Sequence, residues 1–133
     1  MSILLIDDDE DDQFFFVDVL KEFAPDIRCT VANNGLEAIR QLRAASPLPS
    51  LIFLDLNMPI MNGFECLSVI KSESRYKEIP VIIYSTSGDP ATIRKTNQLG
   101  ADGFFRKPSD FGSMHLRLME FLETDFSKGG SSA

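Results

Sequence analysis

Short apolar runs alternate along the chain with segments in which apolar residues recur at helical spacing. Phe16, Val19, Leu20 and Phe23 follow the i, i+3, i+4, i+7 pattern of one helix face, and Pro25 ends that segment. The apolar runs are too short for helices and read as buried strands. The sequence predicts strands at 2–6, 28–32, 51–54, 81–84 and 103–106.

Each predicted strand is followed by a predicted helix. Asp89-Pro90 supplies a cap residue and a proline at the first helical position, and Gly100 ends the helix that follows. Continuous apolar strands separated by helices are typical of a parallel sheet with helices on both faces. The other helices are expected after residue 7, near 36–42, at 63–72 and at 112–124.

Four of the five predicted strands end at a polar residue: Asp7, Asp55, Ser85 and Lys107. The carboxyl ends of parallel strands share one edge of the sheet, and ligands bind there at the point where the strand order reverses. For the order 2-1-3-4-5 this point falls between the first and third strands. We therefore expect the acidic residues to meet there, with Ser85 and Lys107 arriving from the far side.

Crowded carboxylates of this kind raise one another's pKa or attract a cation. Mg²⁺ suits an all-oxygen site that combines one or two carboxylates with water and a phosphate. A carboxylate in such a site can itself attack phosphorus and form an aspartyl phosphate. Mg²⁺ and the Lys107 ammonium would neutralise the phosphoryl oxygens, and the Ser85 hydroxyl would donate a hydrogen bond to one of them.

The sequence resembles the CheY-like receiver domain of two-component response regulators from Ile3 to about Phe126. The resemblance implies a flavodoxin-like (βα)5 three-layer sandwich with a five-stranded parallel sheet of order 2-1-3-4-5. Its motifs are Asp7-Asp8-Asp9, Leu54-Asp55-Leu56-Asn57-Met58-Pro59 with Asn62-Gly63 downstream, Ser85-Thr86, and Lys107-Pro108.

By this resemblance, Asp55 would be the phosphoacceptor. Asp7, Asp8 and Asp55 would hold Mg²⁺ or Mn²⁺, with Asp8 the more direct ligand of the acidic pair. Asn57 would add its backbone carbonyl to the metal, and it also holds a position that modulates phosphoryl lifetime in the family.

The resemblance assigns further roles near the acceptor. Lys107 would be the conserved cation, and Ser85 the switch hydroxyl that shifts together with Phe104. The family usually has Thr at the first switch position and often Tyr at the second, so Phe104 lacks a hydroxyl for a partner. Ser87 would modulate phosphoryl lifetime.

The implied function is that of a single-domain response regulator. A sensor histidine kinase or a histidine phosphotransfer protein would donate the phosphoryl group to Asp55, and the change would alter binding to a separate downstream protein. Such a protein is a signalling switch with self-phosphorylation and autodephosphorylation chemistry, not an enzyme. The receiver domain is expected at 1–127, followed by a flexible tail at 128–133.

Composition excludes several other classes. The net charge of −7 opposes contact with nucleic acid phosphates, and no apolar run is long enough to cross a membrane. Cys29 and Cys66 are too few for a disulfide framework, which favours a cytoplasmic location. Glu10, Asp11 and Asp12 are interpreted as a solvated helix start that complements the helix dipole.

Two other functions share parts of this pattern. A pseudo-receiver would bind partners independently of phosphorylation, although every expected catalytic residue type is present. A haloacid-dehalogenase-type Mg²⁺ phosphatase also forms an aspartyl phosphate, and Asp7-x-Asp9 resembles its first motif. However, Asp11 stands where that motif has Thr or Val, and the chain leaves no room for a cap over a small substrate.

Two apolar pairs have open interpretations. Phe14 and Val17 lie on a different face of the first helix from its core residues, and they are either partly buried without a role or a docking spot for the phosphodonor. Leu116 and Met119 on the last helix belong either to the core or to a homodimer surface.

Overall fold

The computed structural model describes residues 1–123, in which five strands alternate with five helices. The predicted strands are confirmed, and the fourth extends to include Ser85. The predicted domain end at 127, the tail at 128–133 and the end of the last helix at 124 lie outside the described residues. The elements are β1 (Ser2–Ile6), α1 (Glu10–Phe23), β2 (Arg28–Ala32), α2 (Gly35–Ala44), β3 (Leu51–Leu54), α3 (Gly63–Ser72), β4 (Val81–Ser85), α4 (Pro90–Gln98), β5 (Gly103–Arg106) and α5 (Phe111–Phe121).

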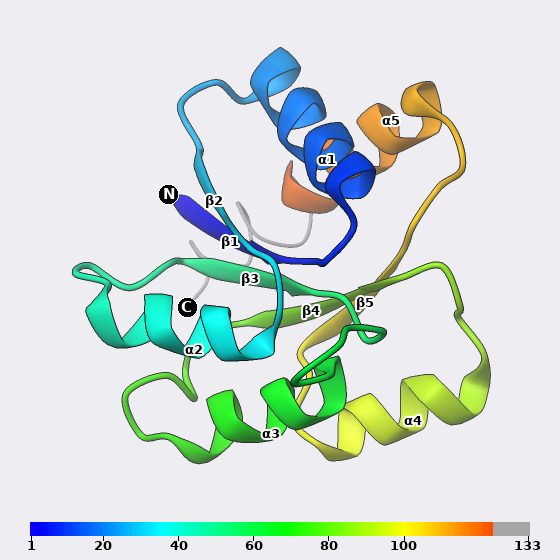
Figure 1. Cartoon of the computed structure of the whole chain (residues 1–133). Coiled ribbons are helices and arrows are strands. Elements are labelled where there is room, and N and C mark those ends of the chain that lie inside the picture. Colours follow the sequence, from blue (N-terminus) through cyan, green and yellow to red (C-terminus); the bar gives the residue numbers. More distant parts are fainter. Residues whose placement is uncertain (124–133) are drawn as a thin grey trace.

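The strands form one parallel sheet in the order β2-β1-β3-β4-β5, which confirms the predicted flavodoxin-like topology. Helices α1 and α5 cover one face, and α2, α3 and α4 cover the other (Figure 1). Ile6 pairs with Leu54 across β1 and β3, so these two neighbouring strands end at the same level. The residues that follow them are therefore neighbours at the carboxyl edge. No helix among residues 1–123 is long and apolar enough to span a bilayer.

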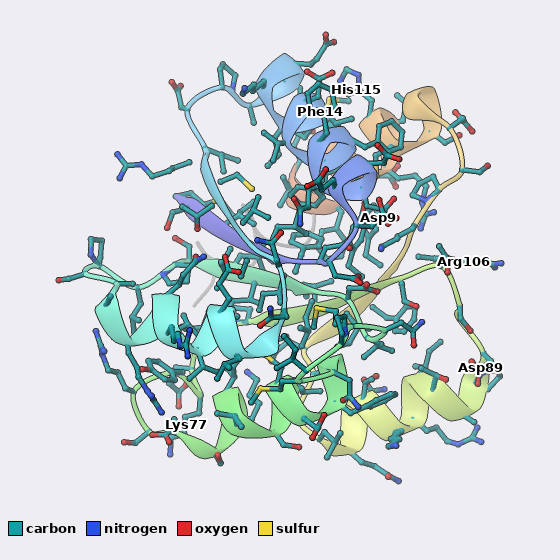
Figure 2. All side chains as sticks on the ribbon, in the orientation of Figure 1. Asp9, Phe14, Lys77, Asp89, Arg106 and His115 are labelled. Carbon is teal, nitrogen blue, oxygen red and sulfur yellow. The ribbon has the colours of Figure 1, made fainter. Side chains whose placement is uncertain are left out.

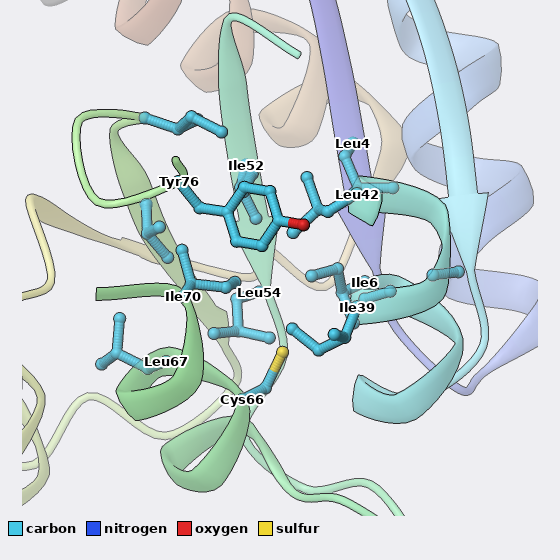
Figure 3. Close-up of a cluster of buried hydrophobic side chains, with 14 of the residues drawn as sticks. Leu4, Ile6, Ile39, Leu42, Ile52, Leu54, Cys66, Leu67, Ile70 and Tyr76 are labelled. Carbon is cyan, nitrogen blue, oxygen red and sulfur yellow. The ribbon is translucent and has the colours of Figure 1, made fainter. Parts of the chain in front are cut away.

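Successive side chains of a strand point to opposite faces of the sheet and pack in two separate hydrophobic cores. Leu4 and Ile6 of β1 pack under α2 and α3, in the cluster of Figure 3, whereas Ile3 and Leu5 pack under α1 and α5. The second core is aromatic, and its rings contact mostly edge to face at centroid distances of 4.9 to 6.0 Å. These rings belong to Phe16, Phe53, Tyr84, Phe105 and Phe121.

Side-chain caps fix the starts of helices near the carboxyl edge of the sheet. Asp9 accepts a hydrogen bond from the Asp12 amide at the start of α1, and Asp89 caps α4 ahead of Pro90, as the sequence predicts. Figure 2 shows Asp9, Asp89 and Arg106 on the side of the strand carboxyl ends, whereas Lys77 lies on the opposite side.

Gly63 allows α3 to begin directly against the end of β3. A Cβ atom at this position would lie 2.3 Å from the Asp55 carbonyl oxygen and 2.6 Å from the Leu56 Cα. Both neighbours are backbone atoms, so no side-chain movement could relieve the overlap. Glycine is therefore required for this approach, which holds the backbone of Asp55 in place.

Candidate functional site

The alternation of the strands brings Asp7, Asp55 and Lys107 to one face of the sheet edge. Each lies two residues beyond a side chain that packs in the aromatic core, namely Leu5, Phe53 or Phe105. The Lys107 Nζ atom lies 2.9 Å from Asp7 Oδ2 and 3.7 Å from Asp55 Oδ1. The structure thus places the lysine nitrogen toward the Asp55 carboxylate, as the sequence interpretation requires.

Backbone hydrogen bonds of the sheet extend to all three residues. The Asp7 amide donates to the Ala32 carbonyl at 3.0 Å, and the Asp55 amide donates to the Ile6 carbonyl at 2.9 Å. The Lys107 amide donates to the Ser85 carbonyl at 2.8 Å. The side chains of the site therefore start from backbone that is as fixed as the strands themselves.

Asp7, Asp8 and Asp55 can share one cation. Each offers a carboxylate oxygen, and these three oxygens lie within 4.8 Å of one another. Asp7 and Asp55 are buried, whereas Asp8 is exposed and open to a ligand arriving from solvent. Such an all-oxygen donor set, open on one side, fits Mg²⁺ or Mn²⁺, which keep water or phosphate oxygens in their remaining positions.

The two buried carboxyls are held in an unfavourable environment for charge. Burial raises the pKa of Asp55 to about 6, Lys107 opposes that rise, and Asp7 adds to it. Burial likewise raises the pKa of Asp7, against a hydrogen bond from the Asp9 amide and the charge of Lys107. A divalent cation would compensate the charge that burial disfavours, so this pocket has a physical reason to bind one.

Lys107 is held from several sides. Its side chain is only 7% exposed, and Nζ lies 4.8 Å from the centroid of the Tyr84 ring. Burial lowers the pKa of Lys107, but contacts with Asp12, Asp7 and Asp55 outweigh burial, and the net shift is upward. The shift therefore favours the charged form of the lysine beside Asp55.

Asp12 belongs to this site, although the sequence interpretation assigned it only to a solvated helix start. Its Oδ2 atom lies 2.8 Å from Lys107 Nζ, which is the shortest ion pair that the lysine makes within residues 1–123. The spacing from Asp12 to Phe16 and Val19 is i, i+4, i+7, so an acid occupies the stripe of α1 that faces the sheet. This spacing is the feature of the sequence that could have placed Asp12 on the side of the helix that faces the sheet.

The predicted switch residues lie on the opposite face of the sheet edge. Ser85 is buried, and its hydroxyl oxygen accepts a hydrogen bond from the Ser87 amide at 3.2 Å. Phe104 packs against the core under α2 and α3, with its ring near Gly88 in the loop after β4. Asn57 is exposed, and its backbone amide donates to the Asp55 carboxylate.

In each of the two apolar pairs noted in the sequence, one side chain is exposed and the other is half-buried. Phe14 on α1 is 72% exposed and labelled in Figure 2, whereas Val17 is half-buried. Leu116 on α5 is 64% exposed, and Met119 is half-buried. Each pair therefore presents one exposed apolar side chain.

Comparison with known proteins defines the class. The family model for the response regulator receiver domain matches residues 3–119, and the chain belongs to that family. It is therefore the receiver domain of a two-component response regulator, a family of signalling domains rather than conventional enzymes.

Among characterised relatives, the chain is 37% identical over 91 residues to the two-component response regulator ARR17 of Arabidopsis thaliana. That alignment covers 61% of this chain and 60% of the relative. It is 38% identical over 77 residues to the chemotaxis protein CheY1 of Helicobacter pylori, covering 58% of this chain and 61% of the relative. The chain thus spans about three fifths of the length of these relatives.

Two solved structures have a similar architecture. The phosphorylated cyanobacterial phytochrome response regulator RcpA superposes with a TM-score of 0.84 at 28% identity, covering 92% of this chain and 91% of that one. The Mn²⁺-bound form of response regulator Rcp1 superposes with a TM-score of 0.81 at 27% identity, covering 92% of each chain. Similar folds have thus been observed in a phosphorylated and in a Mn²⁺-bound state.

Proposed function

We propose that this protein accepts a phosphoryl group on Asp55 from a phosphohistidine donor, in a reaction that requires Mg²⁺ or Mn²⁺. The observation that carries the proposal is the grouping of Asp7, Asp8 and Asp55 oxygens within 4.8 Å, with Lys107 Nζ 3.7 Å from Asp55. The buried Asp55 nucleophile thus has carboxylates beside it that could hold a metal, and a lysine that could bind the phosphoryl group. The donor would be a sensor histidine kinase or a histidine phosphotransfer protein.

Different residues of this chain have different roles in the proposed phosphoryl transfer. An Asp55 carboxylate oxygen attacks phosphorus, the bond from phosphorus to the histidine nitrogen breaks, and the imidazole leaves with the electron pair and takes up a proton from water. Asp7, Asp8 and Asp55, with the Asn57 carbonyl, would hold the metal, which supplies positive charge for the phosphoryl oxygens. Lys107 binds a phosphoryl oxygen on the other side.

The proposed output is a change in partner binding. The Ser85 hydroxyl, which now accepts from the Ser87 amide, would turn to donate to a phosphoryl oxygen, and Phe104 would move with it. Asn57 and Ser87 would set how long the phosphoryl group lasts. The downstream partner is a separate protein, and we place the exchange in the cytoplasm.

Incubation with acetyl phosphate and Mg²⁺ should add one phosphoryl group to the protein. Intact-mass spectrometry should show this gain in the wild type, and chelation of the metal with EDTA should prevent it. Asp55→Asn should abolish the gain because an amide oxygen is a much poorer nucleophile than a carboxylate.

The matched control is Asp26→Asn, which removes the same charge from a residue at the opposite end of the sheet. It should be phosphorylated like the wild type. A gain of one phosphoryl group that persists in Asp55→Asn would refute the assignment of the acceptor.

We also propose that Phe14 and Val17 form part of the docking surface for the phosphodonor. The exposed Phe14 ring follows the acidic turn that begins α1 and lines a surface hollow together with Asp12, which contacts Lys107. Phe14→Glu should slow transfer from a phosphorylated histidine protein at least about fivefold, because binding loses a buried aromatic contact. Phosphorylation by acetyl phosphate should be unchanged.

Leu116→Glu is the control for this prediction, since it places the same charge on an exposed apolar position of α5. It should transfer at the wild-type rate. Equal slowing of both phosphodonors in Phe14→Glu would argue against a docking role. The alternative use of Leu116 and Met119 in a homodimer stays a prediction.

A further inference from the structure

The Lys107 ammonium is shared among three carboxylates, and the one expected to be the phosphoacceptor is the farthest of them. Nζ lies 2.8 Å from Asp12, 2.9 Å from Asp7 and 3.7 Å from Asp55. The first two distances are those of charge-assisted hydrogen bonds, whereas the third is an ion pair without one. In this state the lysine is therefore committed to Asp7 and Asp12.

The two hydrogen-bonded partners are not equivalent. The Asp7 side chain is fully buried, and its second oxygen accepts from the Asp9 amide at 3.0 Å, so Asp7 has a fixed position. The Asp12 side chain is 36% exposed and extends from the first turn of α1. Water can solvate the Asp12 carboxylate when its contact with Lys107 breaks, whereas loss of the same contact would leave the buried Asp7 carboxylate unpaired. The Asp12 contact is therefore the easier one to break.

We propose that Asp12 is a positioning residue that competes for Lys107, and that the phosphoryl group must displace it. The inference rests on the proposed phosphorylation of Asp55. In the unphosphorylated protein, Asp12 holds the ammonium on the α1 side of the pocket. Charge that develops on the phosphoryl group draws Lys107 away, and the partly exposed Asp12 carboxylate becomes hydrated.

The helix dipole alone does not account for Asp12. Asp9 already caps α1, and Glu10 and Asp11 already place negative charge in its first turn. Unlike the exposed Asp11, Asp12 occupies the stripe that faces the sheet and reaches across to the residue after β5. An acid retained on that stripe is explained by its contact with Lys107.

The direction of the effect follows from charge. When acetyl phosphate reacts, a bond forms between an Asp55 oxygen and phosphorus, the bond from phosphorus to the acetyl oxygen breaks, and acetate leaves with the electron pair. The pocket then gains negative charge beside Asp12, and Lys107 has to be shared with it. Removal of the Asp12 charge should therefore favour the transition state and the product over the unphosphorylated protein.

The test is the rate of phosphorylation by acetyl phosphate at saturating Mg²⁺ for the wild type, Asp12→Asn, Asp12→Glu and Asp11→Asn. Asp12→Asn should raise the maximal rate by about three- to tenfold, an effect that shrinks as salt is added. Asp12→Glu keeps the charge, so its maximal rate should be close to that of the wild type. Asp11→Asn removes the same charge from the same helix turn and controls for general repulsion of acetyl phosphate.

A general charge effect would lower the half-saturating acetyl phosphate concentration equally in Asp11→Asn and Asp12→Asn, without raising the maximal rate. That result, or a slower rate in Asp12→Asn, would overturn the inference while leaving phosphorylation of Asp55 intact. Absence of phosphorylation in the wild type would instead refute the proposed function.

A crystal structure of Asp12→Asn tests the competition without any phosphoryl chemistry. In the metal-free crystal, Lys107 Nζ should move from 3.7 Å to within hydrogen-bonding distance of Asp55. An ammonium that stays at its wild-type distance from Asp55 would show that Asp12 does not hold it.

Discussion

Replacement of Lys107 by methionine should lower the rate of phosphorylation at Asp55 by at least about 100-fold at saturating Mg²⁺, measured with acetyl phosphate. Methionine keeps an unbranched apolar stem of similar length but removes the cation that lies 3.7 Å from Asp55. The metal can neutralise only part of the phosphoryl charge, so the transition state loses a contact that water cannot replace in a buried pocket.

Lys71→Met is the control for loss of a lysine ion pair elsewhere in the fold, where the lysine side chain is 14% exposed. Lys71 Nζ lies 2.8 Å from Asp102 and also donates to the Lys77 and Ile79 carbonyls, at the far end of the sheet from Asp55. This variant should lose stability yet be phosphorylated at nearly the wild-type rate. A Lys107→Met rate within a few-fold of the wild type would contradict the role proposed for Lys107.

Gly63→Ala should destabilise the fold by about 2–4 kcal/mol, the largest stability loss we expect from a single added methyl group. The new Cβ would overlap the carbonyl oxygen of Asp55 at 2.3 Å and the Cα of Leu56 at 2.6 Å. The start of α3 or the end of β3 must then shift, and Asp55 moves with it. Urea unfolding measures the loss, and the phosphorylation rate should fall in the protein that remains folded.

Gly112→Ala controls for the general effect of adding alanine to a helix start. Apart from the adjacent residues and the backbone of its own helix, the nearest described atom to its Cβ would be Asp110 Oδ1, at 3.5 Å. This variant should be as stable as the wild type or more stable, by up to about 1 kcal/mol, because the unfolded chain loses entropy. Equal destabilisation by both changes would show that crowding against Asp55 is not the cause.

The pattern of the sequence predicted the fold to within a residue or two at most element boundaries. Strands such as Leu51–Leu54 are uniformly apolar because both of their faces are covered, and this signal survives without any tertiary information. Asp89-Pro90 marked the start of α4 because capping is local chemistry between neighbouring residues. Five such units in alternation restrict the topology to very few arrangements.

The position of Asp12 escaped prediction for a physical reason. Acidic residues at a helix start have a local explanation in the helix dipole, which requires no tertiary partner. The partner of Asp12 is Lys107, which is 95 residues away in sequence and 2.8 Å away in space. Only the packing of α1 across the sheet edge joins the two.

The sequence alone determined the order of the elements, the carboxyl edge of the sheet as the place of the candidate site, and the residue types that gather there. These follow from periodicity and local capping, which neighbouring residues settle among themselves. The tertiary structure decided how the Lys107 charge is divided among Asp7, Asp12 and Asp55, and how closely α3 approaches Asp55 at Gly63. Those outcomes depend on differences of less than an ångström between contact distances and on burial, which exist only once separate segments have packed together.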